Sequence, residues 1–254
     1  MPAFSRSDQH RHDVTSYHLP IHVHYAVVED AVIFMDLRSD QYSLLTGEKA
    51  QLFATSFGPA SQARERVLLI DPSASDESAR ARYALVTELL NCNLLIRGSE
   101  PTPTNRAKLP PPRGDFLAVG DARPARMRLR DVRRFFTACL ASAWRLRYTT
   151  VEDTVGAVER RRRTGRPDHP RDLSELHRLV AVFRRLRPLF PKDALCLFDS
   201  LALLEFLAPY GYCPHWVFAV KLNPWSAHCW AQYADICLNE DAERARQYTV
   251  ILVA

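Results

Sequence analysis

The spacing of apolar residues near the start of the chain predicts a small antiparallel sheet. Apolar and polar residues alternate over 21–27, and a turn at Glu29 and Asp30 separates this run from a second one at 31–37. Another turn leads to a third run at 41–45. Short runs of this kind, joined by tight turns, predict three strands arranged as a meander.

After Thr46 the apolar spacing changes to that of helices. Thr46 is suited to cap a helix that carries Phe53 and Phe57 on its buried side. Two further helices are expected over 63–70 and 76–95. A three-stranded meander followed by three helices predicts a winged-helix-like N-terminal domain.

Residues 99–126 are rich in proline and show little apolar periodicity. Proline lacks a backbone N–H group and fixes its own φ angle, so it disfavours regular helices and central strands. The sequence therefore predicts a partly extended linker between two domains.

The remaining residues, 127–254, show helical spacing first and strand-like runs afterwards. Apolar residues recur at helical intervals in several stretches before Pro188, and a further apolar run covers 196–207. Four short runs are then expected to form an antiparallel sheet: 215–221, 228–234, 235–238 and 248–253. This order of elements predicts an α+β domain.

The composition is that of an ordinary globular protein. The chain has 254 residues, of which 47% are hydrophobic and 25% are charged. No run approaches the length of a membrane span, and the polar first 14 residues lack the apolar stretch of a secretory signal. We therefore expect a cytoplasmic protein without a membrane partner.

The net charge of +5 raises the question of nucleic acid binding. The densest basic run is 160–163, at the end of an expected helix, and such a run is more often a solvated face than a phosphate-binding patch. The third helix of a DNA-binding winged helix enters a groove, but here it carries only Arg80 and Arg82 near its start. We expect no nucleic acid partner.

The six cysteines form no CxxC pairs and are expected to be free thiols. A zinc site could recruit Cys213, His215, His228 and Cys229. Adjacent residues of a strand point to opposite faces, however, so His228 and Cys229 are poorly placed to share one metal. We expect neither a metal nor a cofactor.

Cys196 begins the apolar run at 196–207, where a helix dipole would lower the pKa of a thiol. His228 stands at the start of an expected strand, and Glu240 and Asp241 follow the next one. A hairpin would bring an acid back beside the histidine. Taken singly, each residue is more often structural. Together, the order cysteine, histidine, acid is that of the papain and transglutaminase-like thiol enzymes.

Three segments carry a resemblance to a known family: CLFDSLALLEFLAPYG, PHWVFAVKLNPWSAHCWAQ and LNEDAERARQYTVILV. They resemble the C-terminal peptidase domain of the lasso-peptide B proteins, a transglutaminase-like family that removes the leader from a ribosomally made precursor. The resemblance covers most of residues 126–254 and implies that Cys196 is the nucleophile and His228 the general base. In that family an Asp follows the Asn of an LND-type segment. Here that place holds Glu240, with Asp241 next, so Glu240 is favoured as the acid of the triad and Asp241 is the alternative.

The N-terminal segment LPIHVHYAVVEDAVIFMDLRSDQYSLLTGEKAQLF resembles the RiPP recognition element, a leader-binding domain related to the small chaperone of pyrroloquinoline quinone biosynthesis. The resemblance covers roughly residues 18–98. It implies that a leader adds as a strand to the edge at 41–45 and packs against the last helix. The alternative is that the side chains concerned merely fill the core. The implied leader-binding residues are Phe34, Asp36, Tyr42, Leu44, Leu85 and Leu89.

The two resemblances together imply a leader peptidase of lasso-peptide biosynthesis. Its partners would be the leader of the precursor and a separate, ATP-dependent, asparagine-synthetase-like cyclase that uses the freed amine. The linker would let a bound leader present its downstream end to Cys196. Two alternatives remain: acyl transfer to an amine, as in transglutaminases, and a catalytically inactive leader-binding adaptor.

Overall fold

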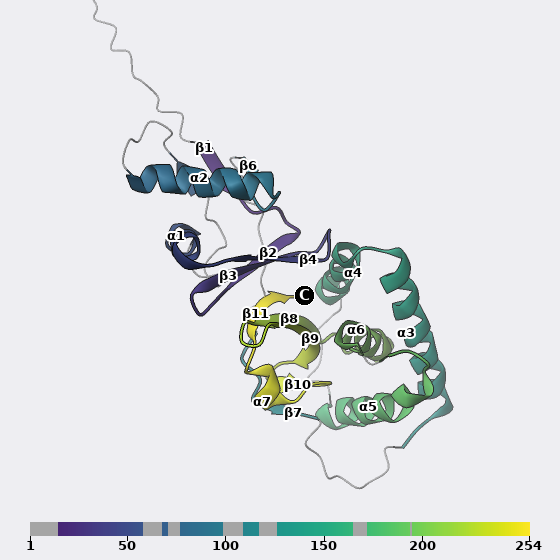
Figure 1. Cartoon of the computed structure of the whole chain (residues 1–254). Helices are drawn as coiled ribbons and strands as arrows, with labels where there is room; N and C mark the ends of the chain where they lie inside the picture. The colour runs from purple at the N-terminus through teal and green to yellow at the C-terminus, as the bar shows by residue number, and fades with distance from the viewer. Residues whose placement is uncertain are drawn as a thin grey trace, which may run out of the picture.

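The computed structural model describes residues 15–57, 68–70, 77–98, 109–116, 126–164, 172–193 and 195–254. An N-terminal part with two small sheets and two helices lies against a larger C-terminal part, in which helices pack on a five-stranded sheet (Figure 1). The chain is thus a mixed α and β protein, as expected.

The predicted meander is present. Strands β2 (Val23–Val28), β3 (Ala31–Asp36) and β4 (Gln41–Leu45) pair antiparallel in the order β2-β3-β4. The two turns use the left-handed residues Glu29 and Asp40, with φ of 55° and 54°. Within this sheet β3 is the central strand, so β4 is an edge strand among the described residues.

Two helices cover one face of this sheet. They are α1 (Gly47–Phe57) and α2 (Glu77–Asn91). Phe53 of α1 makes edge-on contacts with the rings of Tyr25 and Phe34, each at 5.1 Å between ring centroids. Helix α2 ends four residues before the predicted boundary at 95, because Asn93 adopts a left-handed φ of 57° and turns the chain.

One predicted helix is wrong in its described part. Residues 68–70 form strand β5 (Leu68–Ile70), while 63–67 lie outside the described residues. Strand β5 pairs with β1 (Thr15–His18), whose other neighbour is β6 (Ile96–Arg97). A short apolar run fits either a strand or a buried helix. Here the run forms a strand because it pairs with β1, which lies near the start of the chain. The described residues therefore contain two of the three expected helices.

The C-terminal part has its helices first and most of its strands last, as predicted. The helices are α3 (Leu129–Tyr148), α4 (Val151–Thr164), α5 (Leu173–Leu186) and α6 (Cys196–Leu207), with single 3-10 turns at Arg187–Leu189 and Ala208–Tyr210. The strands are β8 (His215–Lys221), β9 (Ser226–Tyr233), β10 (Ile236–Cys237) and β11 (Thr249–Val253), and a short α7 (Ala242–Ala245) precedes the last.

Part of the expected linker belongs to the C-terminal sheet. Strand β7 (Gly114–Asp115) pairs parallel with β10 and completes the order β11-β8-β9-β10-β7. Prolines retain a carbonyl acceptor, and the side chains of Gln232 and Arg246 donate to the carbonyls of Pro110 and Pro112, each at 2.9 Å. The stretch from 109 to 116 is therefore anchored to the C-terminal domain.

The meander is buried on both faces. One face packs on α1 and α2, and the other, with Ala26, Ile33 and Met35, shares a core with α6 and the C-terminal sheet. The contact has a polar margin, where Asn223 donates to the Glu29 carboxylate at 3.0 Å and Arg38 pairs with Glu152 at 3.1 Å. The two domains therefore form one packed unit, and the linker does not set the distance between them.

Ile33→Ala should destabilise the C-terminal domain as well as the meander. Ile33 is fully buried in the shared core, and such a truncation costs about 2–5 kcal/mol of unfolding free energy. All four tryptophans lie in the C-terminal domain, so their fluorescence reports on its unfolding. The urea concentration at the midpoint of this transition should fall in Ile33→Ala. Ile96→Ala, at a residue 41% exposed, is the control and should shift it little. An unchanged tryptophan transition in Ile33→Ala would mean that the domains unfold independently.

Candidate active site

Cys196 is the first residue of α6, a helix that is apolar on almost every side and buried in the core. The segment before it is held by Arg187, which donates to the carbonyls of Lys192 and Asp193 at 3.0 and 3.1 Å. Arg187 also pairs with Asp199, one turn into α6, at 2.5 Å. The arginine thus fixes the approach to the helix, and the half-buried Cys196 side chain opens onto a cleft.

His228 lies in β9, directly opposite Ala219 of β8. Its ring lies 5.5 Å from that of Tyr248 and 6.1 Å from that of Trp230, measured between centroids. Its Nε2 atom is hydrogen-bonded to the carboxylate of Glu240. Because Nε2 is occupied, Nδ1 is the ring nitrogen left for the sulfur of Cys196, which lines the same cleft.

Glu240, and not Asp241, is the acid that contacts His228. Glu240 is only 7% exposed, and its second carboxylate oxygen accepts the backbone N–H of Asp241 at 2.9 Å. Asp241 instead caps α7, since its carboxylate accepts the N–H of Arg244 at 2.7 Å. The preceding Asn239 accepts the N–H of Ala231 at 2.8 Å and ties this turn to β9.

The electrostatics favour a thiolate and an imidazolium. Hydrogen bonding with Cys229, and after it hydrogen bonding with His228 and the charge of His228, lower the pKa of Cys196 to about 4, although burial opposes this. Burial alone would lower the pKa of His228, but hydrogen bonds with Cys196 and Glu240 outweigh it and raise that pKa to about 9. The ion pair is therefore the dominant form near neutral pH, as a reactive cysteine requires.

A cleft of about 600 Å³ opens above the three residues. Arginine side chains form part of its wall, together with apolar residues of α5 and α6. Of the arginines, Arg187 is held by Asp199, while Arg244 is 59% exposed in its side chain and 3.9 Å from Glu240. The cleft thus combines a nucleophile, a base and an orienting acid with a basic rim.

The residues implied in leader binding lie in two different environments. Phe34, Leu85 and Leu89 are at most 5% exposed and belong to the core between the meander and its helices. Tyr42 is half-buried, with its ring 5.6 Å from that of Trp225, and Leu44 is 51% exposed on β4.

Asp36 stabilises the turn after β3. Its carboxylate accepts the N–H of Arg38 at 2.9 Å and the hydroxyl of Ser39 at 2.7 Å. Of the six implied leader-binding residues, therefore, Leu44 alone is largely exposed on the β4 edge, and the others hold the sheet, its core or its turn in place.

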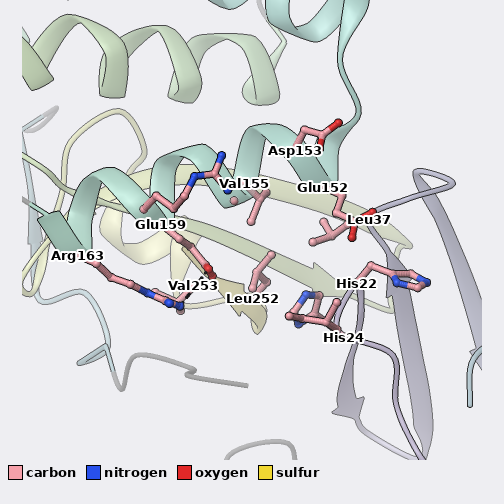
Figure 2. A pocket seen from close by; sticks show the side chains of 13 residues that line it. His22, His24, Leu37, Glu152, Asp153, Val155, Glu159, Arg163, Leu252 and Val253 are labelled. Carbon is pink, nitrogen blue, oxygen red and sulfur yellow. Dashed lines mark hydrogen bonds and ion pairs between the residues drawn. The ribbon is translucent and has the colours of Figure 1, made fainter. Parts of the chain in front are cut away.

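A second cavity, of about 360 Å³, lies where β2, α4 and β11 meet (Figure 2). His22, which precedes β2, and His24 line it on one side, and Glu152, Asp153 and Glu159 of α4 line it on the other. One of these acids, Glu152, is paired with Arg38. No cysteine is among the described residues that line this cavity, so it does not share the thiol chemistry of the first cleft.

The six cysteines are free thiols, as expected. Among the described residues, no group of three or more histidine, cysteine or acidic side chains is placed to hold a metal ion. No described helix is both long enough and apolar enough to cross a membrane.

Two residues of the site were missed at the sequence level. Arg187, which holds the approach to α6, stands nine residues before Cys196 in an arginine-rich stretch where nothing distinguishes it from its neighbours. Cys229 follows His228 directly, and the sequence suggests only a zinc ligand at this position. Its place in the cleft beside Cys196 depends on the packing of α6 against β9, which the order of residues does not reveal.

Comparison with known proteins bears on this part of the chain. Residues 136–253 match the family model of the transglutaminase-like superfamily. No curated protein and no solved structure matches the chain. The matched range contains Cys196, His228 and Glu240, and this superfamily typically uses a catalytic cysteine. The C-terminal domain is therefore transglutaminase-like, as its sequence suggested.

Glu240→Gln should lower the pKa of His228 from its value of about 9 by about 1–2 pH units, because a neutral amide replaces the carboxylate at Nε2. NMR titration of the imidazole carbon shifts measures this directly. Folding raises this pKa above its ordinary value near 6.5, so the stability that the pair contributes is present below that value and is lost as the pH rises through about 9. Asp241→Asn, the control, should titrate like the unaltered protein. Equal effects of the two substitutions would contradict the assignment of Glu240.

Proposed function

We propose that this chain is the leader peptidase of a lasso-peptide pathway, which cuts a ribosomally made precursor between leader and core. The observation that carries the proposal is the contact of Cys196, His228 and Glu240 in one cleft, in a domain packed against a sheet with an open edge. A thiol site explains peptide-bond cleavage, and an open strand edge suits capture of an extended leader.

The first half of the reaction forms a thioester. The Cys196 thiolate attacks the carbonyl carbon of the last leader residue, and the carbonyl π electrons move to oxygen. When the tetrahedral intermediate collapses, the C–N bond breaks and His228 gives its Nδ1 proton to the departing amine of the core. The leader is then held as an acyl group on sulfur, and the core is free.

The second half uses water. Neutral His228 takes a proton from water, the resulting hydroxide adds to the thioester carbon, and the C–S bond breaks to restore the thiolate. Glu240 holds the imidazole through Nε2 in both halves and stabilises its charged form. The leader leaves as a carboxylic acid, and no redox partner is needed.

The start of α6 supplies the developing oxyanion with donors. The first N–H groups of a helix have no partner within the helix, and Leu195, which stands at the cap, provides no side-chain bond to them. An oxygen placed beside Cys196 would meet these N–H groups and the positive end of the helix dipole. Arg187 contributes indirectly, by holding the loop that leads into the helix.

The leader is proposed to add to β4. This strand has only β3 as a described neighbour, and its side chains are half-buried or exposed. Tyr42 of the same strand faces the C-terminal domain and contacts Trp225 in the turn between β8 and β9. A leader paired with β4 is thereby held at a fixed position relative to the strand that carries His228, which raises its effective concentration at the site.

The remaining parts of the proposal follow from the family resemblance. The freed core amine would be joined to an acidic side chain by a separate, ATP-dependent, asparagine-synthetase-like cyclase, and both proteins would work in the cytoplasm. Acyl transfer to an amine is the second candidate, since the thioester does not itself distinguish water from an amine. An inactive adaptor is disfavoured by the intact contacts among Cys196, His228 and Glu240.

Incubation of the purified chain with the precursor peptide from its gene neighbourhood should give one cut, seen by mass spectrometry as leader and core. Cys196→Ala should abolish it, because the nucleophile is lost. Glu240→Gln should slow it by about 10- to 10³-fold, while Asp241→Asn should retain most of the rate.

The same mixture with an added primary amine separates the alternatives. A leader recovered with the mass of the amide would establish acyl transfer, and a leader acid alone supports hydrolysis. A precursor that binds and stays whole, even with the cyclase added, would support the adaptor and contradict the peptidase.

Leu44→Asp should weaken leader binding by about tenfold, because it places a charge on the exposed apolar position of the β4 edge. Fluorescence anisotropy of a labelled leader peptide measures the dissociation constant. Leu140→Asp is a matched control, since Leu140 is also exposed but lies on α3. Equal loss in both variants, or no loss in Leu44→Asp, would place the leader elsewhere.

A further inference from the structure

The catalytic cleft carries more positive than negative charge. Among the described residues that line it, three arginines and two acids have a fixed charge at neutral pH: Arg184, Arg187, Arg244, Asp199 and Glu240. The thiolate and the imidazolium of the catalytic pair cancel each other, so one positive charge is left over. A cleft with such a surplus attracts an anionic group of its substrate.

Arg187 is not available to a substrate. Its guanidinium pairs with Asp199 at 2.5 Å, and it also donates to three backbone carbonyls. These belong to Phe190, Lys192 and Asp193, at 3.2, 3.0 and 3.1 Å. The five N–H donors of an arginine are largely used by such a set, so the charge and the donors of Arg187 hold the protein together.

Arg244 is placed differently. Its backbone N–H is fixed by the Asp241 carboxylate at 2.7 Å, but its side chain is 59% exposed. The carboxylate of Glu240 lies 3.9 Å from the Arg244 guanidinium, which is longer than a hydrogen bond. Both oxygens of that carboxylate are engaged elsewhere, one by His228 and one by the N–H of Asp241. Arg244 can therefore take up a substrate carboxylate while Glu240 keeps both of its hydrogen bonds.

An alternative role for Arg244 is to adjust the charge of Glu240. Burial acts to raise the pKa of Glu240, whereas hydrogen bonds with His228 and Asp241, then the charge of His228 and last the charge of Arg244 lower it. Arg244 thus makes the smallest of these contributions, and Glu240 is held by the other two residues. The charge of Arg244 is left to act on what enters the cleft.

We propose that Arg244 is a specificity-determining residue, which binds the side-chain carboxylate of an Asp or Glu in the substrate, close to the scissile bond. The guanidinium group suits this role because it can donate two parallel hydrogen bonds to one carboxylate. Arg184 of α5 adds a second positive charge to the same cleft, since its partner at 3.1 Å is the neutral carbonyl of Phe116.

The position of the acidic residue follows from the order of contacts. Arg244 lies beside Glu240, which holds His228, and His228 faces the cleft with Cys196. The acid is therefore expected about two to four residues from the scissile bond, because an extended chain advances about 3.3 Å per residue. This part of the inference rests on the proposed peptidase function.

A pair of thiol reagents tests the charge of the cleft without any peptide. Iodoacetate and iodoacetamide are similar in size and differ in charge, and both react with the thiolate. The ratio of their rates at Cys196 therefore cancels any change in the thiolate fraction. Arg244→Gln should lower the iodoacetate-to-iodoacetamide ratio by about threefold, and Arg244→Glu by about tenfold. Peptide mass spectrometry reads Cys196 separately from the exposed Cys92.

Arg133→Glu is the matched control, since Arg133 is an exposed arginine of α3 that lines a different cavity. It should leave the ratio at Cys196 unchanged. If Arg244 served only to adjust Glu240, its replacement would change the two rates together and the ratio would stay constant. A constant ratio in Arg244→Glu would therefore overturn the inference.

Cleavage of the precursor gives the second readout. Replacing the acidic residue at the expected position by its amide should lower kcat/KM about tenfold with the unaltered protein, and Arg244→Gln should lose this difference. A precursor without an acid there, or one cut equally fast in its acid and amide forms, would overturn the inference and leave the peptidase intact. If the reagent ratio falls as expected but the precursor stays whole, the peptidase is contradicted and the preference of the cleft for an anion stands.

Discussion

Helix α6 packs against β9, and this contact sets both the stability of the C-terminal domain and its chemistry. The helix is almost wholly apolar, so it must be covered on all sides, by α3 and α5 on one side and by the sheet on the other. Its first residue then lies at the margin of the core, where a thiol can be half-buried and still face the cleft. Neither the nucleophile nor its partners can shift without disturbing this packing.

The N-terminal meander depends on the same core. Because its second face is covered by the C-terminal domain, leader recognition and catalysis would share one set of buried contacts. Tyr42 marks the connection, since it stands on the edge strand and contacts the turn that leads into β9. Its pKa is raised, first by burial and then, in decreasing order, by Cys229, Asp40 and Cys196. The edge strand is therefore within electrostatic reach of the reacting thiol.

The sequence predicted the strands of the meander and the order of the C-terminal elements because these follow from local periodicity. It pointed to Cys196, which begins α6, and to His228, which lies near the start of β9. The sequence favoured Glu240 by its position alone, since the choice between Glu240 and Asp241 depends on one turn, in which Asp241 caps a four-residue helix. Strand β5 was missed because its partner β1 lies far away in sequence.

The sequence does carry an indication that both faces of the meander are buried. The stretch Ala31–Asp36 is nearly continuous in apolar residues instead of alternating, which is typical of a strand covered on two sides. The family resemblance implied a role in leader binding for Phe34, whereas Phe34 fills the core.

The shared core has a consequence for how the chain could be divided. Separating the two domains would expose Ala26, Ile33 and Met35 on one piece and the matching surface of the C-terminal domain on the other. Such complementary apolar faces are those of an obligate complex, so the two pieces, supplied as separate polypeptides, would behave as subunits and assemble with each other. The two domains are then held together by their buried contact surface, and the covalent connection between them is not needed for their association.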